Sequence, residues 1–436
     1  MKVLILSQEC WRDDQNGGNV LSNIFDGFQA EFAQIYCSEE YPSNKLCKRY
    51  YQMTDSMMVD YHLKRRKRER IGRPLIFEEY PVDTNEKNIE TSQGGVIKAV
   101  YKLKGLGLPV MQVAREIVWK LSPWYSEKLI EFVKDFDPDI IFAPCYGAHY
   151  MLKMTRLIYE LTKKPIISYI SDDFYTNRQL NFSPLFWINH FLLRKSIRKT
   201  VKLYSLMYTM TNEQKKQCEK DFDVPMKILR KSCKNNLEYE SKELTIPIKL
   251  IYAGGLYLNR WVTLARLVKE IKKINENKFC YELNIYTNSR LSKKQDLLLN
   301  DRINSKVFQA VSGEILRDKY KESDIALHVE GFDIKHRLMV RLSFSTKIVD
   351  CIESGCAIMA ICDKKQAGLA YLKRNNAAIC IDSLNKIPLV LNEILENIEI
   401  LEEFREKAYR LGIKKHNKEI ITKELQDDFR KVASRK

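Results

Sequence analysis

An alternation of strands and helices that runs along the chain twice restricts its fold more than any other feature. In the first half, apolar runs at 2–7, 140–145, 166–170 and 203–209 are separated by stretches of helical period, the first of them at 19–32. Apolar runs of this length with few polar residues are typical of parallel strands buried on both faces. This half is therefore expected to form a doubly wound α/β sheet.

The same pattern restarts after a polar stretch at residues 234–245. Six strand-like runs follow it, at 249–255, 281–287, 306–310, 325–329, 357–361 and 378–381. We therefore predict two Rossmann-like α/β domains that face each other across a cleft, one at 1–235 and one at 246–400. A helix at about 415–436 is expected to return to the first domain. Residues 45–122 are expected to be a basic insertion, because the alternation is lost there.

Composition narrows the class of protein further. The eleven cysteines are scattered without a CxxC spacing and the six histidines are dispersed, so we expect buried free thiols, a reducing cytoplasmic setting and no metal. Neither a signal peptide nor an apolar run of about 20 residues is recognisable. The net charge of +17 favours polyanionic partners, among which charge alone does not choose.

The segment 343–361, SFSTKIVDCIESGCAIMAI, is the strongest candidate site. Ser345 and Thr346 open a short helix whose free N–H groups and positive end can hold an anion, and Lys347 adds a full charge. This arrangement suits a pyrophosphate. Asp350 follows one turn later, where it can accept hydrogen bonds from ribose hydroxyls. A capped helix with a surface lysine remains the alternative.

The order of strand, STKI, acidic residue, four residues, glycine and strand resembles the donor-binding element of GT-B glycosyltransferases. The resemblance is to the family-four-like enzymes of bacterial polysaccharide assembly. It implies that Asp350 contacts the nucleotide ribose and that Glu330, in the sequence HVEGF, approaches the sugar. This chain departs from the family pattern, because an extra polar segment at 333–342 separates the two acidic residues and the second is an aspartate.

Other parts of the chain fit the same resemblance. Arg260, in IYAGGLYLNR, is the expected balance for the diphosphate, although an exposed arginine at a helix start explains it equally well. Thr287 and Asn288 end a predicted strand, where open sheets bind ligands. Gly17 and Gly18 resemble the loop that faces the donor phosphates, and a plain turn is the alternative.

Asp172 and Asp173 follow the predicted strand at 166–170. Two adjacent carboxylates at a strand end repel each other, which raises one pKa and suits a general base near the acceptor. A helix cap or a turn is the competing interpretation. We count Asp172, Asp173 and Glu330 as the candidate catalytic residues.

The function that this resemblance implies is metal-independent hexosyl transfer from a nucleotide sugar to a hydroxyl of a glycan or a lipid-linked acceptor, with retention at the anomeric carbon. A nucleotide-sugar epimerase on the same fold and a noncatalytic protein that binds nucleic acid or an anionic surface are the alternatives. The basic run at 64–70 and the mixed apolar and basic segment at 102–124 further predict attachment to the inner face of a membrane. An amphipathic helix packed on its own domain explains the second segment as well.

Overall fold

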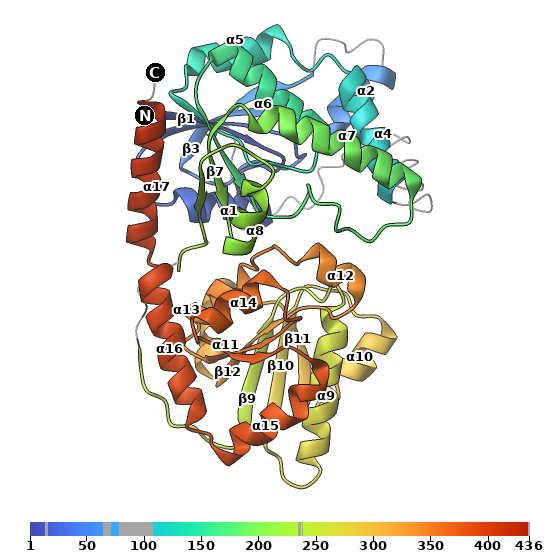
Figure 1. The fold of residues 1–436 in the computed structure, drawn as a ribbon, viewed down its shortest axis with the longest axis vertical. Helices are drawn as coiled ribbons and strands as arrows, with labels where there is room; N and C mark the ends of the chain where they lie inside the picture. The colour runs from blue at the N-terminus through green and yellow to red at the C-terminus, as the bar shows by residue number, and fades with distance from the viewer. Residues whose placement is uncertain (14–15, 64–70, 78–107, 234–236, 238, 435–436) are drawn as a thin grey trace.

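The computed structural model contains two α/β halves stacked end to end, each built on its own sheet (Figure 1). The structure describes residues 1–13, 16–63, 71–77, 108–233, 237 and 239–434. The basic run at 64–70 and the start of the segment at 102–124 therefore lie outside the described residues.

The sheet of the first half is parallel except at one edge. Its strands are β1 (Lys2–Ser7), β2 (Glu31–Tyr36), β3 (Cys47–Gln52), β4 (Arg73–Ile76), β5 (Ile140–Phe142), β6 (Ile166–Ile170), β7 (Tyr204–Thr209) and β8 (Met226–Ile228). Their spatial order is β4-β3-β2-β1-β5-β6-β7-β8, and only β4 runs antiparallel to its neighbour. The order reverses between β1 and β5, as in doubly wound folds.

The helices of the first half connect these strands. They are α1 (Asn16–Phe25), α2 (Asp55–Leu63), α4 (Leu108–Leu121), α5 (Glu127–Phe136), α6 (His149–Thr162), α7 (Pro184–Val201) and α8 (Asn212–Glu219). Serine or threonine side chains cap three of them, because Ser126, Ser183 and Thr211 each accept a hydrogen bond from the N–H three residues later.

The second half repeats the architecture with a wholly parallel sheet. Its strands are β9 (Ile248–Ala253), β10 (Tyr281–Thr287), β11 (Ser305–Gln309), β12 (Ile325–Val329), β13 (Ala357–Ile361) and β14 (Ile379–Ile381). The order β11-β10-β9-β12-β13-β14 is that of doubly wound dinucleotide-binding sheets. It reverses between β9 and β12. The predicted strands of this half are confirmed to within two residues at their ends.

The helices that follow β9 end in two, α16 and α17, that lie one after the other along the molecule (Figure 1). They are α9 (Arg260–Asn275), α10 (Lys293–Leu299), α11 (Gly313–Lys321), α12 (Ile334–Met339), α13 (Lys347–Glu353), α14 (Ala367–Arg374), the 3-10 turn η3 (Leu384–Lys386), α15 (Ile387–Glu396), α16 (Ile400–Lys415) and α17 (Lys418–Ala433). In Figure 1, α16 lies beside the second half and α17, in red, beside the first.

A continuous apolar core ties these helices to both halves. Phe429 of α17 packs edge-on against Phe25 and Phe28 of the first half. Leu411 of α16 and Ile352 of α13 belong to the same cluster of buried residues. The expected return of the C-terminal helix is therefore seen in the packing.

Two predictions about the first half need correction. The helix expected to run to residue 32 ends at Phe25, and Glu31–Tyr36 is the second strand of the sheet. β3 and β4 also belong to this sheet, although they lie inside the range expected to be an insertion. β3 is CKRYYQ and β4 is RPLI. Both contain basic residues, so neither has the apolar pattern of a buried strand.

Helix α4 packs on its own half through α2, α6 and α7. Trp119 is fully buried and donates to Asp55, while Trp124 is buried beside it. Neither tryptophan of the segment expected at a membrane is therefore available to lipid. In the described part of the chain, no helix is long and apolar enough to cross a membrane. All eleven cysteines are free, and ten are buried as predicted.

Candidate active site

The candidate site lies where β9 and β12 end, at the reversal of strand order in the second sheet. Gly254 and Gly255 follow β9, while Glu330 and Gly331 follow β12. The two strands are parallel neighbours, so their carboxyl ends meet at one edge. In open α/β sheets, this reversal forms the crevice that binds ligands.

Arg260 is the first residue of α9, and its guanidinium is fixed by Glu330. Nε donates to Oε2 at 2.9 Å and Nη2 donates to Oε1 at 3.0 Å. Burial by itself would lower the pKa of Arg260, but the Glu330 carboxylate outweighs it and raises this pKa. The third nitrogen, Nη1, is buried and has no hydrogen-bond partner among the described residues. Glu330 therefore orients Arg260 and leaves one donor available for a ligand.

Lys347 lies across the backbone at Gly254. A Cβ on Gly254 would be 2.0 Å from Cε of Lys347, so any other residue would displace the lysine side chain. A Cβ on Gly255 would be 2.2 Å from the ring of Tyr257. The two glycines thus serve close approach of side chains to the backbone, and this explains their place after β9.

Two cations, Arg260 and Lys347, therefore meet here with only one carboxylate, Glu330, paired to them among the described residues. Within the described ranges, the ammonium group of Lys347 has neither a hydrogen bond nor an ion pair. Burial, reinforced by the charge of Arg260, lowers the pKa of Lys347. His328 of β12 lies in the same field: burial lowers its pKa to about 4, and its Nε2 is buried without a partner among the described residues. A bound diphosphate would reverse the repulsion between Arg260 and Lys347.

The start of α13 adds backbone donors. Among residues that the structure describes, the N–H groups of Ser345, Thr346 and Lys347 reach no protein acceptor. The helix has seven residues, so its dipole adds little, and Lys347 supplies most of the positive charge. Gly355 ends the helix region with φ of +73°, as predicted.

Asp350 does not stand alone on α13, as the sequence suggested. Its Oδ1 is paired with the ammonium group of Lys231, which belongs to the segment leaving the first half. The Asp350 side chain is 40% exposed. The pair thus brings the expected ribose residue to the junction of the two halves.

A strained loop sets the start of α9. Leu258 and Asn259 have φ of +58° and +57°, which residues other than glycine adopt at a cost. Nδ2 of Asn259 donates to Asp333 at 2.9 Å, and the carbonyl oxygen of Leu258 would lie 2.3 Å from a Cβ on Gly331. The glycine of HVEGF therefore lets this loop close over the end of β12.

Thr287 and Asn288 lie at the end of β10 and contact the neighbouring loops. The Thr287 hydroxyl accepts from the N–H of Ser289, whose own hydroxyl accepts from Leu256. Asn288 is exposed and accepts from Gln309. Thr287 thus supports the loop that carries Arg260, and only Asn288 is open to a ligand.

Asp173 serves a turn and an ion pair between the two halves. It accepts hydrogen bonds from the N–H groups of Tyr175 and Thr176 and from the Thr176 hydroxyl. Nη2 of Arg341 adds a 3.0 Å ion pair from the second half. With its carboxylate buried and occupied, Asp173 fits the turn that was the alternative interpretation.

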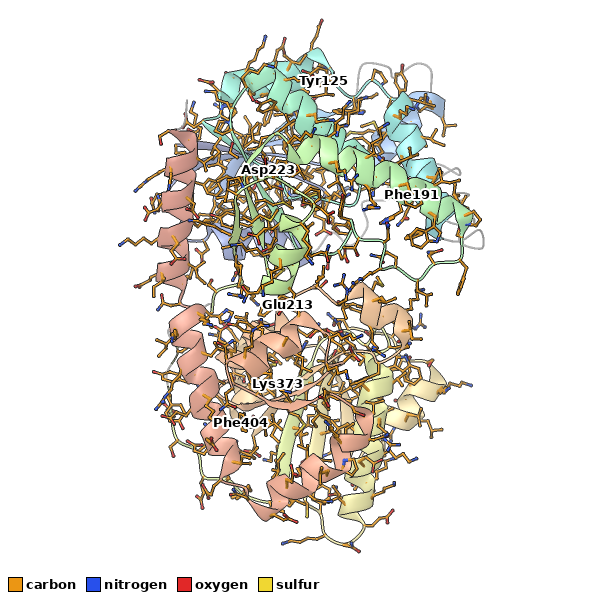
Figure 2. The ribbon with its side chains drawn as sticks, in the orientation of Figure 1. Tyr125, Phe191, Glu213, Asp223, Lys373 and Phe404 are labelled. Atoms are coloured by element: carbon orange, nitrogen blue, oxygen red, sulfur yellow. The ribbon has the colours of Figure 1, made fainter. Side chains whose placement is uncertain are left out.

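Asp172, next to it, is exposed. Its Oδ1 accepts from the hydroxyl of Ser343 at 2.8 Å, again across the junction. The Thr211 hydroxyl donates to the carbonyl of Leu342, and Arg374 pairs with Glu213, which Figure 2 labels between the halves. The extra segment at 333–342 thus forms α12 and the bend after it, and this bend contacts the first half.

Gly17 and Gly18 lie in the first turn of α1 and not in a loop before it. His149 begins α6, and its Nε2 contacts Asn189 at 3.2 Å. His416 is fully buried, contacting the carbonyl of Lys231 and the hydroxyl of Tyr371. Both histidines have the contacts expected of structural residues.

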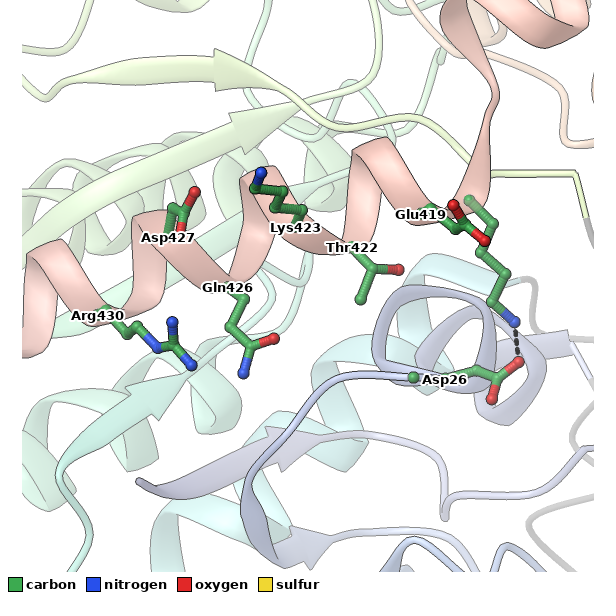
Figure 3. A pocket seen from close by; sticks show the side chains of 9 residues that line it. Asp26, Glu419, Thr422, Lys423, Gln426, Asp427 and Arg430 are labelled. Carbon is green, nitrogen blue, oxygen red and sulfur yellow. Dashed lines mark hydrogen bonds and ion pairs between the residues drawn. The ribbon is translucent and has the colours of Figure 1, made fainter.

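A groove lies on another part of the surface, away from this site. It has a volume of about 380 Å³ and is formed by α17 and the turn after α1 (Figure 3). Lys418 and Asp26 pair across one end of it. The groove is open and its charges are mixed, so it does not share the surplus of positive charge found beside Gly254.

Sequence reasoning missed four residues of the candidate site and its surroundings: His328, Tyr257, Lys231 and Arg341. Tyr257 follows the predicted glycine turn, and the Arg260 guanidinium lies 4.8 Å from the centre of its ring. The adjacency of Tyr257 to the glycines was a usable signal. The others depend on contacts between distant parts of the chain.

Comparison with known proteins bears on the fold of the chain. No protein-family model matches the chain, and no curated protein matches its sequence. Solved structures of GT-B glycosyltransferases do match. Sucrose-phosphate synthase from Thermosynechococcus elongatus has a TM-score of 0.62 at 9% identity, over 99% of this chain and 98% of that one.

Two further structures hold nucleotide sugars. The E. coli trehalose-6-phosphate protein bound with UDP-2-fluoro glucose has a TM-score of 0.61 at 9% identity, over 100% of this chain and 99% of that one. Anabaena HepE in complex with UDP-glucose has a TM-score of 0.59 at 10% identity, over 99% and 100%. These similarities extend over both halves, and the chain has the GT-B fold that its sequence predicted.

Proposed function

We propose that this protein is a glycosyltransferase that moves a hexosyl group from a nucleoside-diphosphate sugar to a hydroxyl of a glycan or lipid-linked acceptor. The observation that carries the proposal is the pair of cations beside Gly254. Arg260 keeps a buried Nη1 and Lys347 an ammonium group, and neither has a partner in the described part of the chain. Known structures of the same fold hold UDP and UDP-glucose.

In this proposal, Arg260 and Lys347 bind the diphosphate and stabilise it as it departs. Two fixed cations can supply the charge that a metal would otherwise provide, so we propose that transfer proceeds without one. Glu330 acts on Arg260, whose position it sets, and not on the sugar. The amides of Ser345 and Thr346 add donors, and Asp350 contacts the ribose from its pair with Lys231.

On the acceptor side, we assign Asp172 to orient the acceptor hydroxyl, because it is the exposed member of the carboxylate pair. Asp173 maintains the turn beneath it. If transfer retains the anomeric configuration, the departing phosphate can itself accept the proton of the acceptor. Such a reaction requires no protein nucleophile. We place it at the inner face of a membrane, where a lipid-linked acceptor would be presented.

The test is a binding screen in EDTA with UDP, GDP, dTDP and ADP, each compared with its nucleoside. One diphosphate should raise the melting temperature, since a ligand at a hundred times its Kd stabilises the protein by about 2.7 kcal/mol. The matching nucleoside should not. Failure of all four diphosphates in EDTA, with recovery on adding Mg²⁺, would exclude the metal-independent part of the proposal.

The same preparation separates the alternatives. Conversion of the nucleotide sugar without an acceptor would identify an epimerase. RNA binding with a steep dependence on salt, together with no affinity for any nucleotide sugar, would identify a polyanion-binding protein. Nothing in the site favours the epimerase, because Glu330 and Asp173 are both occupied by arginines.

A further inference from the structure

An unusual apolar surface lies at the start of α7 and in the segment before it. Phe182 is 91% exposed, and Ile188, Phe191 and Leu192 are each more than half exposed. The last three share one face of the helix, while His190, Leu193 and Ile197 are buried on the other. Figure 2 labels Phe191 on the outside of the first half. We refer to Phe182, Ile188, Phe191 and Leu192 as the α7 apolar surface.

Basic residues continue the same helix face. Lys195 and Lys199 follow Leu192 at helical spacing, and both are exposed. From residue 174 to residue 212 the sequence holds six lysines and arginines and not a single aspartate or glutamate. Apolar side chains followed by cations without counter-charges are the pattern of a surface that meets anionic lipid.

The segment that leads to this surface starts at the junction of the two halves. Asp173 pairs with Arg341 there, and its carbonyl oxygen accepts from Nε2 of Gln179. Phe182 follows only nine residues after Asp173. α4, which packs against α7, carries exposed Ile117 and Leu121. The apolar surface thus borders the side on which the proposed acceptor would enter.

We propose that the α7 apolar surface, with Lys195 and Lys199, seats the protein on an anionic lipid bilayer. This inference rests on the proposed function for one point: membrane binding would bring a lipid-linked acceptor to the site. A second copy of the chain is a poorer occupant, because it would bring the same cations to the interface and no anion to balance them. A lipid surface instead supplies the missing negative charge.

Vesicle flotation of the full chain tests this inference. Wild type should float with vesicles of equal parts phosphatidylglycerol and phosphatidylcholine, and not with phosphatidylcholine alone. Substituting serine at Phe182, Ile188, Phe191 and Leu192 should lower binding at least about tenfold. Lys195→Ser with Lys199→Ser should lower it roughly thirtyfold at low salt. A matched control places serine at the exposed Leu297, Ile303 and Leu389 of the second half and should float like wild type.

Three outcomes would overturn the proposal: wild type that does not float, an apolar variant that floats like wild type, or a wild-type dimer that the apolar substitutions convert to monomer. The single variant Phe182→Ser, at the most exposed site, keeps the test valid if the fourfold variant fails to fold.

Calorimetry with nucleoside diphosphates is the second readout. Unchanged nucleotide binding in variants that no longer float separates this surface from the donor site, and loss of the donor function alone would leave flotation intact.

Discussion

Two buried arginine–carboxylate pairs, one within the second half and one between the two halves, differ in their surroundings. Arg260 and Glu330 belong to one half, and beside them Lys347 has no carboxylate of its own among the described residues. Arg341 and Asp173 join the two halves, and beside them lies a second carboxylate, Asp172. The first place has one more cation than it has carboxylates, while the second holds the halves together and offers the exposed Asp172 carboxylate to a hydroxyl. We infer that donor binding uses the first and acceptor binding the second.

The largest effect should come from breaking the first pair. Arg260→Met leaves the Glu330 carboxylate buried without its counter-charge, and it should lower the free energy of unfolding by about 3–5 kcal/mol. Urea denaturation of the full chain measures this change in the free energy of unfolding. Lys269→Met, at an exposed position of the same helix, is the control and should change stability far less. Equal losses in the two variants would show that the Arg260 pair is not the more important one.

The second effect is a loss of stability in acid, to which one histidine beside the first pair and one at the end of α16 contribute. Burial lowers the pKa of His328, near Arg260, Lys347 and Glu330, and of His416, near Arg230 and Lys415, to about 4. The unfolded chain binds these protons near pH 6.5, so stability is complete above that pH and falls as the pH drops toward 4. At pH 5, each histidine should cost about 2 kcal/mol.

Denaturation by urea at pH 7 and pH 5 checks this sign and size. His416→Gln cannot take up the proton and should lose about half of the pH dependence, while a His62→Gln control at the surface should keep all of it. An unfolding free energy that does not change between the two pH values would contradict the buried, uncharged state of both histidines.

Breaking the second pair should have a smaller effect. Arg341→Met removes one charge-assisted hydrogen bond from Asp173, which keeps its bonds from Tyr175 and Thr176, and the cost should be about 1.5–3 kcal/mol. The two halves should then unfold in separate steps, because the contact between them is weakened. Differential scanning calorimetry would show two transitions in place of one, and a single unchanged transition would argue against a joining role.

The smallest effect on stability is expected at Asp350. Its pair with Lys231 is partly exposed, so Asp350→Asn should cost less than about 1 kcal/mol. The donor KM should nevertheless rise if Asp350 binds the ribose, and the rise should vanish with a deoxyribose donor. Lys231→Met is the matched variant: it should disturb the pair without removing the carboxylate. Equal responses to ribose and deoxyribose donors in wild type and Asp350→Asn would reject the assignment.

The sequence predicted the parts of the fold that depend on local pattern. β6, β10, β12 and β13 begin and end at the predicted residues. β6, β12 and β13 are nearly continuous apolar runs, as buried parallel strands are, while β10 alternates apolar and polar residues over its first half. β2 was missed because the apolar residues of 31–36 extend the period of the helix before it, and β3 because it contains lysine and arginine. Pattern alone does not separate such edges from helices or loops.

The candidate site was predictable only as a set of residues. Two short stretches predicted its residues: 251–260 contains the glycine pair and Arg260, and 343–361 contains Lys347. The pairings were not predicted in this way: Glu330 lies 70 positions from Arg260, and Arg341 lies 168 positions from Asp173. Such pairs are set by how the sheets and loops fold together. For that reason the sequence did not indicate that Glu330, predicted to approach the sugar, pairs with Arg260.

The most direct test of the account is calorimetric titration of Lys347→Ala with the nucleoside diphosphate that binds wild type. The variant loses a charge-assisted phosphate contact worth roughly 1.5–3 kcal/mol, so its Kd should rise at least about tenfold while its melting temperature without ligand is maintained. Lys278→Ala, an exposed lysine of the same half, should bind like wild type. Unchanged affinity in Lys347→Ala would contradict the claim that Lys347 and the free Nη1 of Arg260, beside Gly254, form the donor site.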